Sequence, residues 1–234
     1  MSKLRPRPQR GQFHLPKELY GYSALGAPLF YFPAQSGHKP GLVMAGTHGD
    51  EVAAVVALSC ALRSLATNQL KHHVILAVNP DGCQLGTRCN ANGVDLNRNF
   101  ATENWDGGGN VYRWNSTADA RDVQLGTGNR PASESETSAL SQLITKLAPP
   151  WTVSIHEPLG CVEDPDKTTL GAWLAEGMQL PLVEQLGYQT PGSFGTWCAE
   201  RALPCITVEF PPISADAASE EYLDILIDLI TYDQ

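Results

Sequence analysis

The sequence predicts an α/β domain with a largely parallel central sheet. Short apolar runs typical of buried strands alternate with longer segments whose apolar residues recur at helical spacing. This alternation is typical of parallel strands that are connected by helices. The chain has 234 residues, 42% of them hydrophobic, which is enough for one large core but short for two domains. We therefore expect residues 1–234 to form a single domain.

The first expected elements lie in the N-terminal half. The apolar segments 41–46 (GLVMAG) and 73–80 (HVILAVNP) predict two buried strands. Between them, residues 50–66 predict a helix that has these residues near one face: Val52, Val55, Val56, Leu62 and Leu65. Residues 83–130 are polar, rich in glycine and asparagine, and weakly periodic. We expect a long loop region there, and long loops in compact domains are often functional.

The C-terminal half continues the alternation. A helix is expected from the sequence SESE, where Ser133 and Glu136 fit a capping box. Its expected apolar face consists of Leu140, Leu143, Ile144 and Leu147. The segments 151–157 (WTVSIHE) and 205–210 (CITVEF) predict two further strands, and 215–232 predicts the last helix. Because sites in such sheets collect at the carboxyl ends of strands, polar residues at those ends are candidates for function.

The composition argues against several kinds of partner and location. The net charge is −9 and no basic stripe with interleaved aromatic residues is present, so no nucleic-acid partner is expected. No apolar run reaches about 18 residues, so no membrane span is expected. The basic start is followed by no apolar signal segment, and the six cysteines include no C-x-x-C pair. We expect reduced cysteines and a bacterial cytoplasmic location, and a homodimer is compatible with the sequence.

The first candidate site consists of His48, Glu51 and His156. His48 and Glu51 lie three residues apart after the first predicted strand, and His156 lies near the end of a distant strand. A catalytic zinc commonly takes three protein ligands and leaves one position for water, and two histidines with one glutamate are a known set. Taken singly, each residue also fits a helix cap or a buried hydrogen bond. The spacing alone therefore leaves metal binding open.

The second candidate site lies in residues 87–100 (TRCNANGVDLNRNF). Arg88, Asn97 and Arg98 bring two guanidinium groups and an amide into one loop of an acidic protein. Arginine binds carboxylates through two parallel hydrogen bonds. A solvated loop with an ion pair is the alternative. One arginine fits that alternative well, but the adjacent Asn97 and Arg98 fit it poorly.

Five motifs in this order resemble those of the zinc carboxypeptidases: THGDE, NPDG, GVDLNRNF, SIHE and TVEF. The resemblance covers about residues 41–211. It implies a mixed, mainly parallel, eight-stranded sheet flanked by helices. Further segments resemble the murein peptide amidases of bacteria: YGYSALGAPL, VNPDGCQLG, VYRWNS, TPGSFGTWC and EFPPIS. This implies hydrolysis of the γ-D-glutamyl–meso-diaminopimelate bond of free murein tripeptide in peptidoglycan recycling.

The resemblance also implies roles for residues at the reacting bond. His48, Glu51 and His156 match the three ligands of one zinc ion per chain. Arg88 matches the arginine that polarises the scissile carbonyl. Glu209, near the end of the last predicted strand, matches the general base.

Other positions match residues that hold the substrate. Asn97 and Arg98 match the pair that binds the terminal carboxylate. Tyr188 resembles the tyrosine that closes over bound substrate, although a buried, hydrogen-bonded tyrosine is an alternative there. The role of Glu157, directly after a proposed ligand, stays open between support of the metal site and a surface acid. The acidic segment 161–166 (CVEDPD) could bind the distal ammonium of diaminopimelate, or it could be a solvated loop.

Two other functions fit part of this pattern. The first is a zinc deacylase of the aspartoacylase or succinylglutamate desuccinylase kind, which shares the H-x-x-E pair, a later histidine and a similar loop. The segment GYQTPGSFGTWC and the spacing of Arg88 favour the peptidase instead. The second is a non-catalytic zinc-binding module, which predicts loss of the base or of a ligand. The proposed base and ligands are all present in this sequence.

Overall fold

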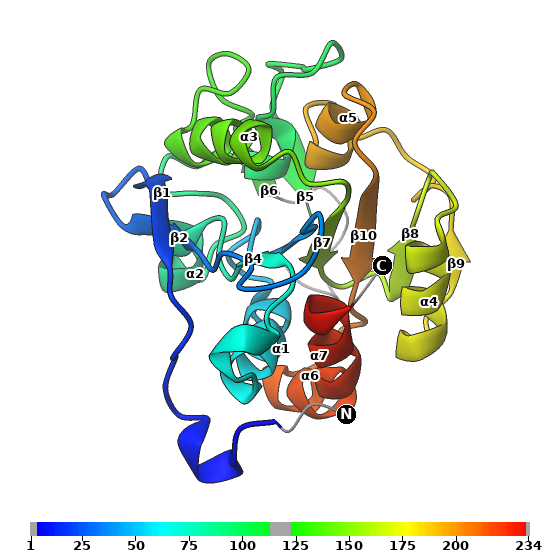
Figure 1. Cartoon of the computed structure of the whole chain (residues 1–234). Coiled ribbons are helices and arrows are strands. Elements are labelled where there is room, and N and C mark those ends of the chain that lie inside the picture. The colour runs from blue at the N-terminus through cyan, green and yellow to red at the C-terminus, as the bar shows by residue number, and fades with distance from the viewer. Residues whose placement is uncertain (1–3, 113–122, 233–234) are drawn as a thin grey trace.

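A mixed six-stranded sheet forms the centre of the molecule in the computed structural model, which describes residues 4–112 and 123–232 (Figure 1). In spatial order its strands are β4 (His73–Ile75), β3 (Leu42–Ala45), β7 (Thr152–His156), β10 (Cys205–Glu209), β8 (Cys161–Glu163) and β9 (Leu182–Val183). The first four run parallel to one another. Strand β8 is antiparallel to β10 and parallel to β9. The expected α/β class and mixed sheet are therefore present.

The expectation of eight strands in this sheet is wrong, because the described part of the chain places six there. Strands β1 (Glu18–Tyr22) and β2 (Pro28–Tyr31) form a separate antiparallel hairpin. The hairpin reaches the sheet through one antiparallel bridge, between Phe32 and Val74 of β4. The amide of Ala34 donates to the His73 imidazole at 3.2 Å instead of to a strand carbonyl, so the pairing ends there.

A second ribbon lies outside the central sheet as well. Strands β5 (Asn110–Tyr112) and β6 (Val123–Leu125) pair with each other in antiparallel register. Both fall in the segment that was expected to be a long loop, which also contains the end of α2 (Pro80–Leu85) and the short 3-10 helix η3 (Leu96–Arg98). The match to VYRWNS extends beyond Tyr112 into residues outside the described ones.

Helices cover both faces of the sheet (Figure 1). One face packs on α1 (Val52–Ser64), α4 (Thr169–Met178), α6 (Ala215–Glu221) and α7 (Leu223–Thr231). The other packs on α3 (Ser135–Leu147) and α5 (Phe194–Ala199). Alternate residues of β3 serve the two cores: Val43 and Ala45 belong to the first, Leu42 and Met44 to the second. This explains why the strands appear in the sequence as continuous apolar runs. No helix in the described residues combines the length and apolar character needed to cross a membrane.

The predicted buried face of α1 is partly wrong. Val52 and Val56 are exposed, by 46% and 37%. The buried face consists of Ala53, Ala54, Ala57, Leu58, Ala61, Leu62 and Ser64. Because this helix is apolar almost all round, its periodicity did not single out one face. The small alanine side chains lie where α1 packs on α6 and α7.

Two helix boundaries also differ from the prediction. Helix α3 begins at Ser135 without a side-chain cap, and Ser133 hydrogen-bonds the Glu134 carboxylate at 2.7 Å, so the expected capping box is absent. The predicted last helix is two helices that meet at Tyr222. The Tyr222 ring stacks on Phe210 with 4.4 Å between ring centroids, which anchors the break in the core.

The strand register brings the candidate site together. His156 and Glu209 are the last residues of β7 and β10, and their Cα atoms are register partners across these parallel strands. His48 follows the end of β3, the other neighbour of β7, by three residues. The carboxyl ends of three adjacent parallel strands therefore supply three candidate residues, as the sequence predicted.

Candidate active site

His48, Glu51 and His156 form a buried cluster with converging donor atoms. Nδ1 of His48 lies 2.7 Å from Glu51 Oε1, and Nδ1 of His156 lies 2.9 Å from Glu51 Oε2. The two imidazole Nδ1 atoms are 3.2 Å apart. All three side chains are at most 5% exposed. Two ring nitrogens and a carboxylate facing one point are a donor set that suits zinc.

The second nitrogen of each imidazole has its own partner. Nε2 of His48 lies 3.1 Å from Asp95 Oδ1, and Nε2 of His156 lies 2.9 Å from the Ser154 hydroxyl. These contacts hold both rings with Nδ1 toward the cluster, as is typical of metal-binding histidines. The residues present therefore fit a zinc ion. Sequence reasoning missed Asp95 and Ser154, although Ser154 is two residues before His156 on the same face of β7.

The charges of the cluster compensate one another. Burial acts to raise the pKa of the Glu51 carboxyl, but His48 and His156 outweigh it and hold that pKa below its usual range. Burial likewise acts against ionised Asp95, yet His48 and Arg88 hold its pKa well below the usual range. Both carboxylates are therefore ionised at neutral pH.

The loop that contains His48 packs tightly on α2 and on the following loop, which contains Arg88. A Cβ atom at Gly49 would overlap the backbone of Gly82 in α2, so only glycine allows this approach. The Gly49 amide donates to the Arg88 carbonyl at 3.3 Å. Arg88 Nη1 in turn lies 3.0 Å from Glu51 Oε1. A guanidinium group is thus held at the edge of the cluster.

Asp95 links the cluster to the loop of Asn97 and Arg98. Its Oδ1 atom accepts the Asn97 amide at 2.9 Å as the cap of η3, and the same atom faces His48. Its Oδ2 atom lies 3.5 Å from Arg88 Nε and accepts from the Asn110 side chain at 2.7 Å. One buried carboxylate therefore positions both candidate sites of the sequence analysis.

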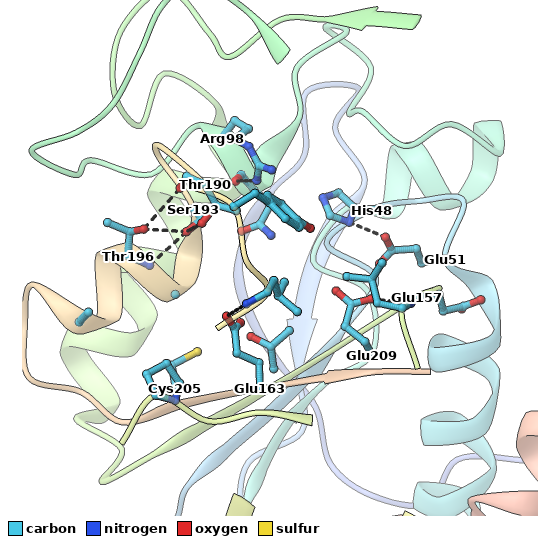
Figure 2. A pocket seen from close by; sticks show the side chains of 18 of the residues that line it. His48, Glu51, Arg98, Glu157, Glu163, Thr190, Ser193, Thr196, Cys205 and Glu209 are labelled. Carbon is cyan, nitrogen blue, oxygen red and sulfur yellow. Dashed lines mark hydrogen bonds and ion pairs between the residues drawn. The ribbon is translucent and has the colours of Figure 1, made fainter. Parts of the chain in front are cut away.

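Glu209 and Glu157 lie near Glu51 (Figure 2). Burial raises the pKa of the Glu209 carboxyl, and the nearby His156 partly opposes this. Its Oε2 atom accepts the Leu159 amide at 3.4 Å. Glu157 accepts the Ala54 amide at 3.1 Å in the first turn of α1, so it stabilises the start of that helix rather than lying free on the surface.

A cavity of about 340 Å³ opens beside the cluster and reaches Asn97, Arg98 and Tyr188 (Figure 2). Asn97 Oδ1 accepts the Phe194 amide at 2.8 Å, which leaves the side-chain NH2 as the free donor of this amide. Arg98 Nη1 donates to the Asn97 carbonyl at 2.6 Å. Tyr188 is 57% exposed, so the alternative of a buried tyrosine is wrong. All eight predicted site residues thus lie in this cavity or in the cluster beside it.

Comparisons with known proteins agree with this geometry. A family model for zinc carboxypeptidases matches residues 21–157. Murein peptide amidase A of Escherichia coli K12 is 58% identical over 233 residues, which cover 99% of this chain and 96% of that protein. The protein of the same name from Vibrio campbellii is 54% identical over 231 residues, 98% of this chain and 93% of the relative.

Solved structures place the fold in the same group. The crystal structure of murein-tripeptide amidase from Escherichia coli O157 superposes with a TM-score of 0.97 at 58% identity, covering 100% of this chain and 99% of that one. Bovine thrombin-activatable fibrinolysis inhibitor, at 17% identity and a TM-score of 0.70, covers 93% of this chain and 88% of its own, and shares the fold. The chain therefore belongs to the zinc carboxypeptidase family and is a zinc-dependent hydrolase.

Proposed function

We propose that this enzyme hydrolyses the amide bond between γ-D-glutamate and meso-diaminopimelate in free murein tripeptide, L-Ala-γ-D-Glu-meso-diaminopimelate. The observation that carries the proposal is the cavity that joins the buried His-Glu-His cluster to Asn97 and Arg98. That arrangement suits an amide with a free carboxylate beside it. The 58% identity to proteins named murein peptide amidase A supports the choice of substrate.

In this proposal His48, Glu51 and His156 hold the zinc ion. Zinc in such a site lowers the pKa of water and polarises a carbonyl oxygen. The protein's contribution is a buried donor set with both histidines oriented by Asp95 and Ser154. These contacts set the orientation of both rings, as is typical of histidines that bind a metal ion.

Glu209 is the proposed general base. Its position at the end of β10, beside His156 of β7, places a carboxylate next to the cluster. Glu209 takes a proton from the attacking water and passes it to the leaving nitrogen, which requires an ionised carboxylate at the start of the cycle. Arg88 faces the negative charge that develops on the carbonyl oxygen, and a fixed cation stabilises that charge more than it stabilises the substrate.

Asn97 and Arg98 are proposed to bind the free α-carboxylate of diaminopimelate beside the scissile bond. The Phe194 amide fixes the orientation of the Asn97 side chain, so its NH2 group is presented as a donor. Tyr188 lines the same cavity and is exposed, as expected of a side chain that closes over bound substrate. These residues position the substrate rather than take part in the chemistry.

The proposal places the whole chain, as one catalytic domain, in the bacterial cytoplasm. Recycled wall peptides are free tripeptides there, whereas the intact wall lies outside. A homodimer is the assembly to test against a monomer, by light scattering coupled to size-exclusion chromatography.

A product assay tests this function. The purified enzyme should convert the tripeptide to L-Ala-D-Glu and free diaminopimelate, detected by mass spectrometry. N-acetylaspartate and N-succinylglutamate serve as substrates for the deacylase alternative and should remain uncut. If the enzyme released ordinary α-linked C-terminal amino acids faster than it cut the tripeptide, the murein assignment would be wrong. The enzyme would then be a general zinc carboxypeptidase.

A further inference from the structure

The face of β10 that ends in Glu209 continues into the cavity. Cys205, Thr207 and Glu209 alternate along the strand, so their side chains share one face, and all three line the cavity. The neighbouring antiparallel strand β8 pairs its Glu163 with Thr207. Glu163 also lines the cavity, and Figure 2 shows it beside Cys205, across the cavity from Arg98.

The Glu163 carboxylate is held in place but has no cationic partner among the described residues. Its Oε1 atom accepts the Leu186 amide at 3.1 Å, and Thr207 is its register partner on β10. No ion pair involves Glu163 in the described ranges 4–112 and 123–232. Partial burial of a carboxylate costs free energy, and a cationic group of a ligand would offset part of that cost.

The other acids of the 161–166 segment are used differently. Asp164 is buried, and its Oδ2 atom accepts both the amide and the hydroxyl of Thr168, at 2.6 and 2.7 Å. These bonds stabilise the turn before α4. Asp166 is exposed and also lines the cavity. Within this acidic segment, Glu163 is therefore the half-buried carboxylate that faces the cavity and still has acceptor capacity.

The position of Glu163 matches the length of the proposed product. In meso-diaminopimelate, three methylene groups separate the α-carbon beside the scissile bond from the second amino-acid head. Glu209 and Thr207 are two strand residues apart, about 6.6 Å along β10, and Glu163 is the register partner of Thr207. A side chain that extends from the scissile bond along β10 therefore brings its distal ammonium to Glu163.

The opposite wall offers neutral donors. The hydroxyl groups of Thr190, Ser193 and Thr196 form a hydrogen-bonded cluster, with Ser193 Oγ 3.0 Å from each of the other two (Figure 2). All three residues line the cavity. Hydroxyl groups can turn to donate to the distal carboxylate, so the cavity suits a zwitterionic head with its ammonium on the Glu163 side.

We propose that Glu163 is the specificity-determining residue that binds the distal ammonium group of the diaminopimelyl side chain. This inference rests on the proposed function and assigns the recognition of the far end of its substrate. Glu163 takes no part in the chemical step. Its effect should therefore appear only with substrates that carry the ammonium.

Three tripeptides separate the contributions. They are L-Ala-γ-D-Glu followed by meso-diaminopimelate, by L-lysine or by L-norleucine. Lysine keeps the distal ammonium without the carboxylate, and norleucine lacks both. The wild type should show higher kcat/KM for the first two than for norleucine. Glu163→Gln should lower kcat/KM for both ammonium substrates about 10- to 100-fold, the usual loss for a hydrogen bond to a charged group. The norleucine rate should stay within about twofold, which also shows that the variant is folded.

Glu176→Gln is the matched control, since it makes the same chemical change at an exposed position of α4 that does not line the cavity. It should leave all three values near those of the wild type. The inference is overturned if Glu163→Gln keeps the preference for ammonium substrates, or if Glu176→Gln loses it as well. A wild type that cuts none of the three tripeptides would contradict the proposed function itself. A wild type that cuts all three equally would contradict only the role of Glu163.

Discussion

Two regions that meet in one cavity are held in place by different means. The metal corner comprises His48, Glu51, His156 and Glu209. The cavity wall comprises Asn97, Arg98, Glu163 and the segment 186–196. Two residues of the corner are the last residues of paired parallel strands, and all four side chains are buried. The wall is made of loops and short elements, and its Tyr188 is 57% exposed.

We infer from this difference that the metal corner carries the chemistry and that the cavity wall selects the substrate. Strand register holds His156 and Glu209, whereas His48 and Glu51 lie between β3 and α1 and are held by buried contacts with Asp95 and Arg88. Side-chain bonds hold the wall: Asn97 Oδ1 to the Phe194 amide, and Ser193 Oγ to the Thr196 amide at 3.1 Å. Changes in the corner should therefore affect every substrate, and changes in the wall should affect substrates selectively.

The largest effect is expected from His156→Ala. Removing one of three proposed ligands should abolish stoichiometric zinc binding and reduce hydrolysis of every peptide to background. Metal analysis of the purified variant checks this. His14→Ala, which alters an exposed histidine, is the control and should retain both zinc and activity. A zinc content near one per chain in His156→Ala would show that the ligand assignment is wrong.

Glu209→Gln should separate metal binding from turnover. The variant keeps the size of the side chain but loses the proton acceptor, so kcat should fall roughly 10²- to 10⁴-fold for all substrates while zinc content is unchanged. Steady-state kinetics and metal analysis on the same sample measure both. Glu220→Gln, on the exposed side of α6, should behave as the wild type. If Glu209→Gln kept near wild-type turnover, Glu209 would not be the general base.

Arg98→Ala should act selectively, because Arg98 belongs to the wall. The wild type should cut a tripeptide with a free α-carboxylate much faster than the same peptide amidated at that carboxylate. The variant should lose about 2 kcal/mol of this discrimination, roughly 30-fold. Comparing kcat/KM for the acid and the amide in both proteins measures it. Equal cleavage of acid and amide by the wild type would contradict the anchoring role.

The smallest effect is expected from Ser193→Ala. This change removes the cap of α5 and should lower the free energy of unfolding by about 1 kcal/mol. The wall should loosen, so KM should rise while zinc content stays the same. Ser214→Ala removes the corresponding cap of α6, outside both regions, and should cost similar stability without a change in KM. Loss of zinc in Ser193→Ala would mean that wall and corner are not independent.

The sequence predicted the residues at strand ends better than the contacts that support them, for a physical reason. A histidine or glutamate at the end of an apolar strand is readable from local sequence, and parallel register then brings such ends together. The sequence did not predict the role of Asp95, because Asp95 and its partner His48 are 47 residues apart in the chain. Helix α5 is six residues long, and β8 and β9 have three and two, which is too short for a periodic signal.

The number of sheet strands was mispredicted for a related reason. It depends on whether the hairpin β1–β2 continues its pairing past Phe32, and the Ala34 amide there donates to the His73 imidazole instead of to a strand carbonyl. The exposed valines of α1 show the same limit, since a helix that is apolar all round carries no clear periodic signal.

X-ray diffraction of zinc-loaded crystals at the zinc absorption edge tests the central claim most directly, namely that the strand-end corner is the catalytic metal site. The account predicts one anomalous peak per chain, at about 2.0–2.2 Å from Nδ1 of His48, Nδ1 of His156 and a carboxylate oxygen of Glu51. A peak bound by other residues, or by the Nε2 atoms that face Asp95 and Ser154, would contradict it.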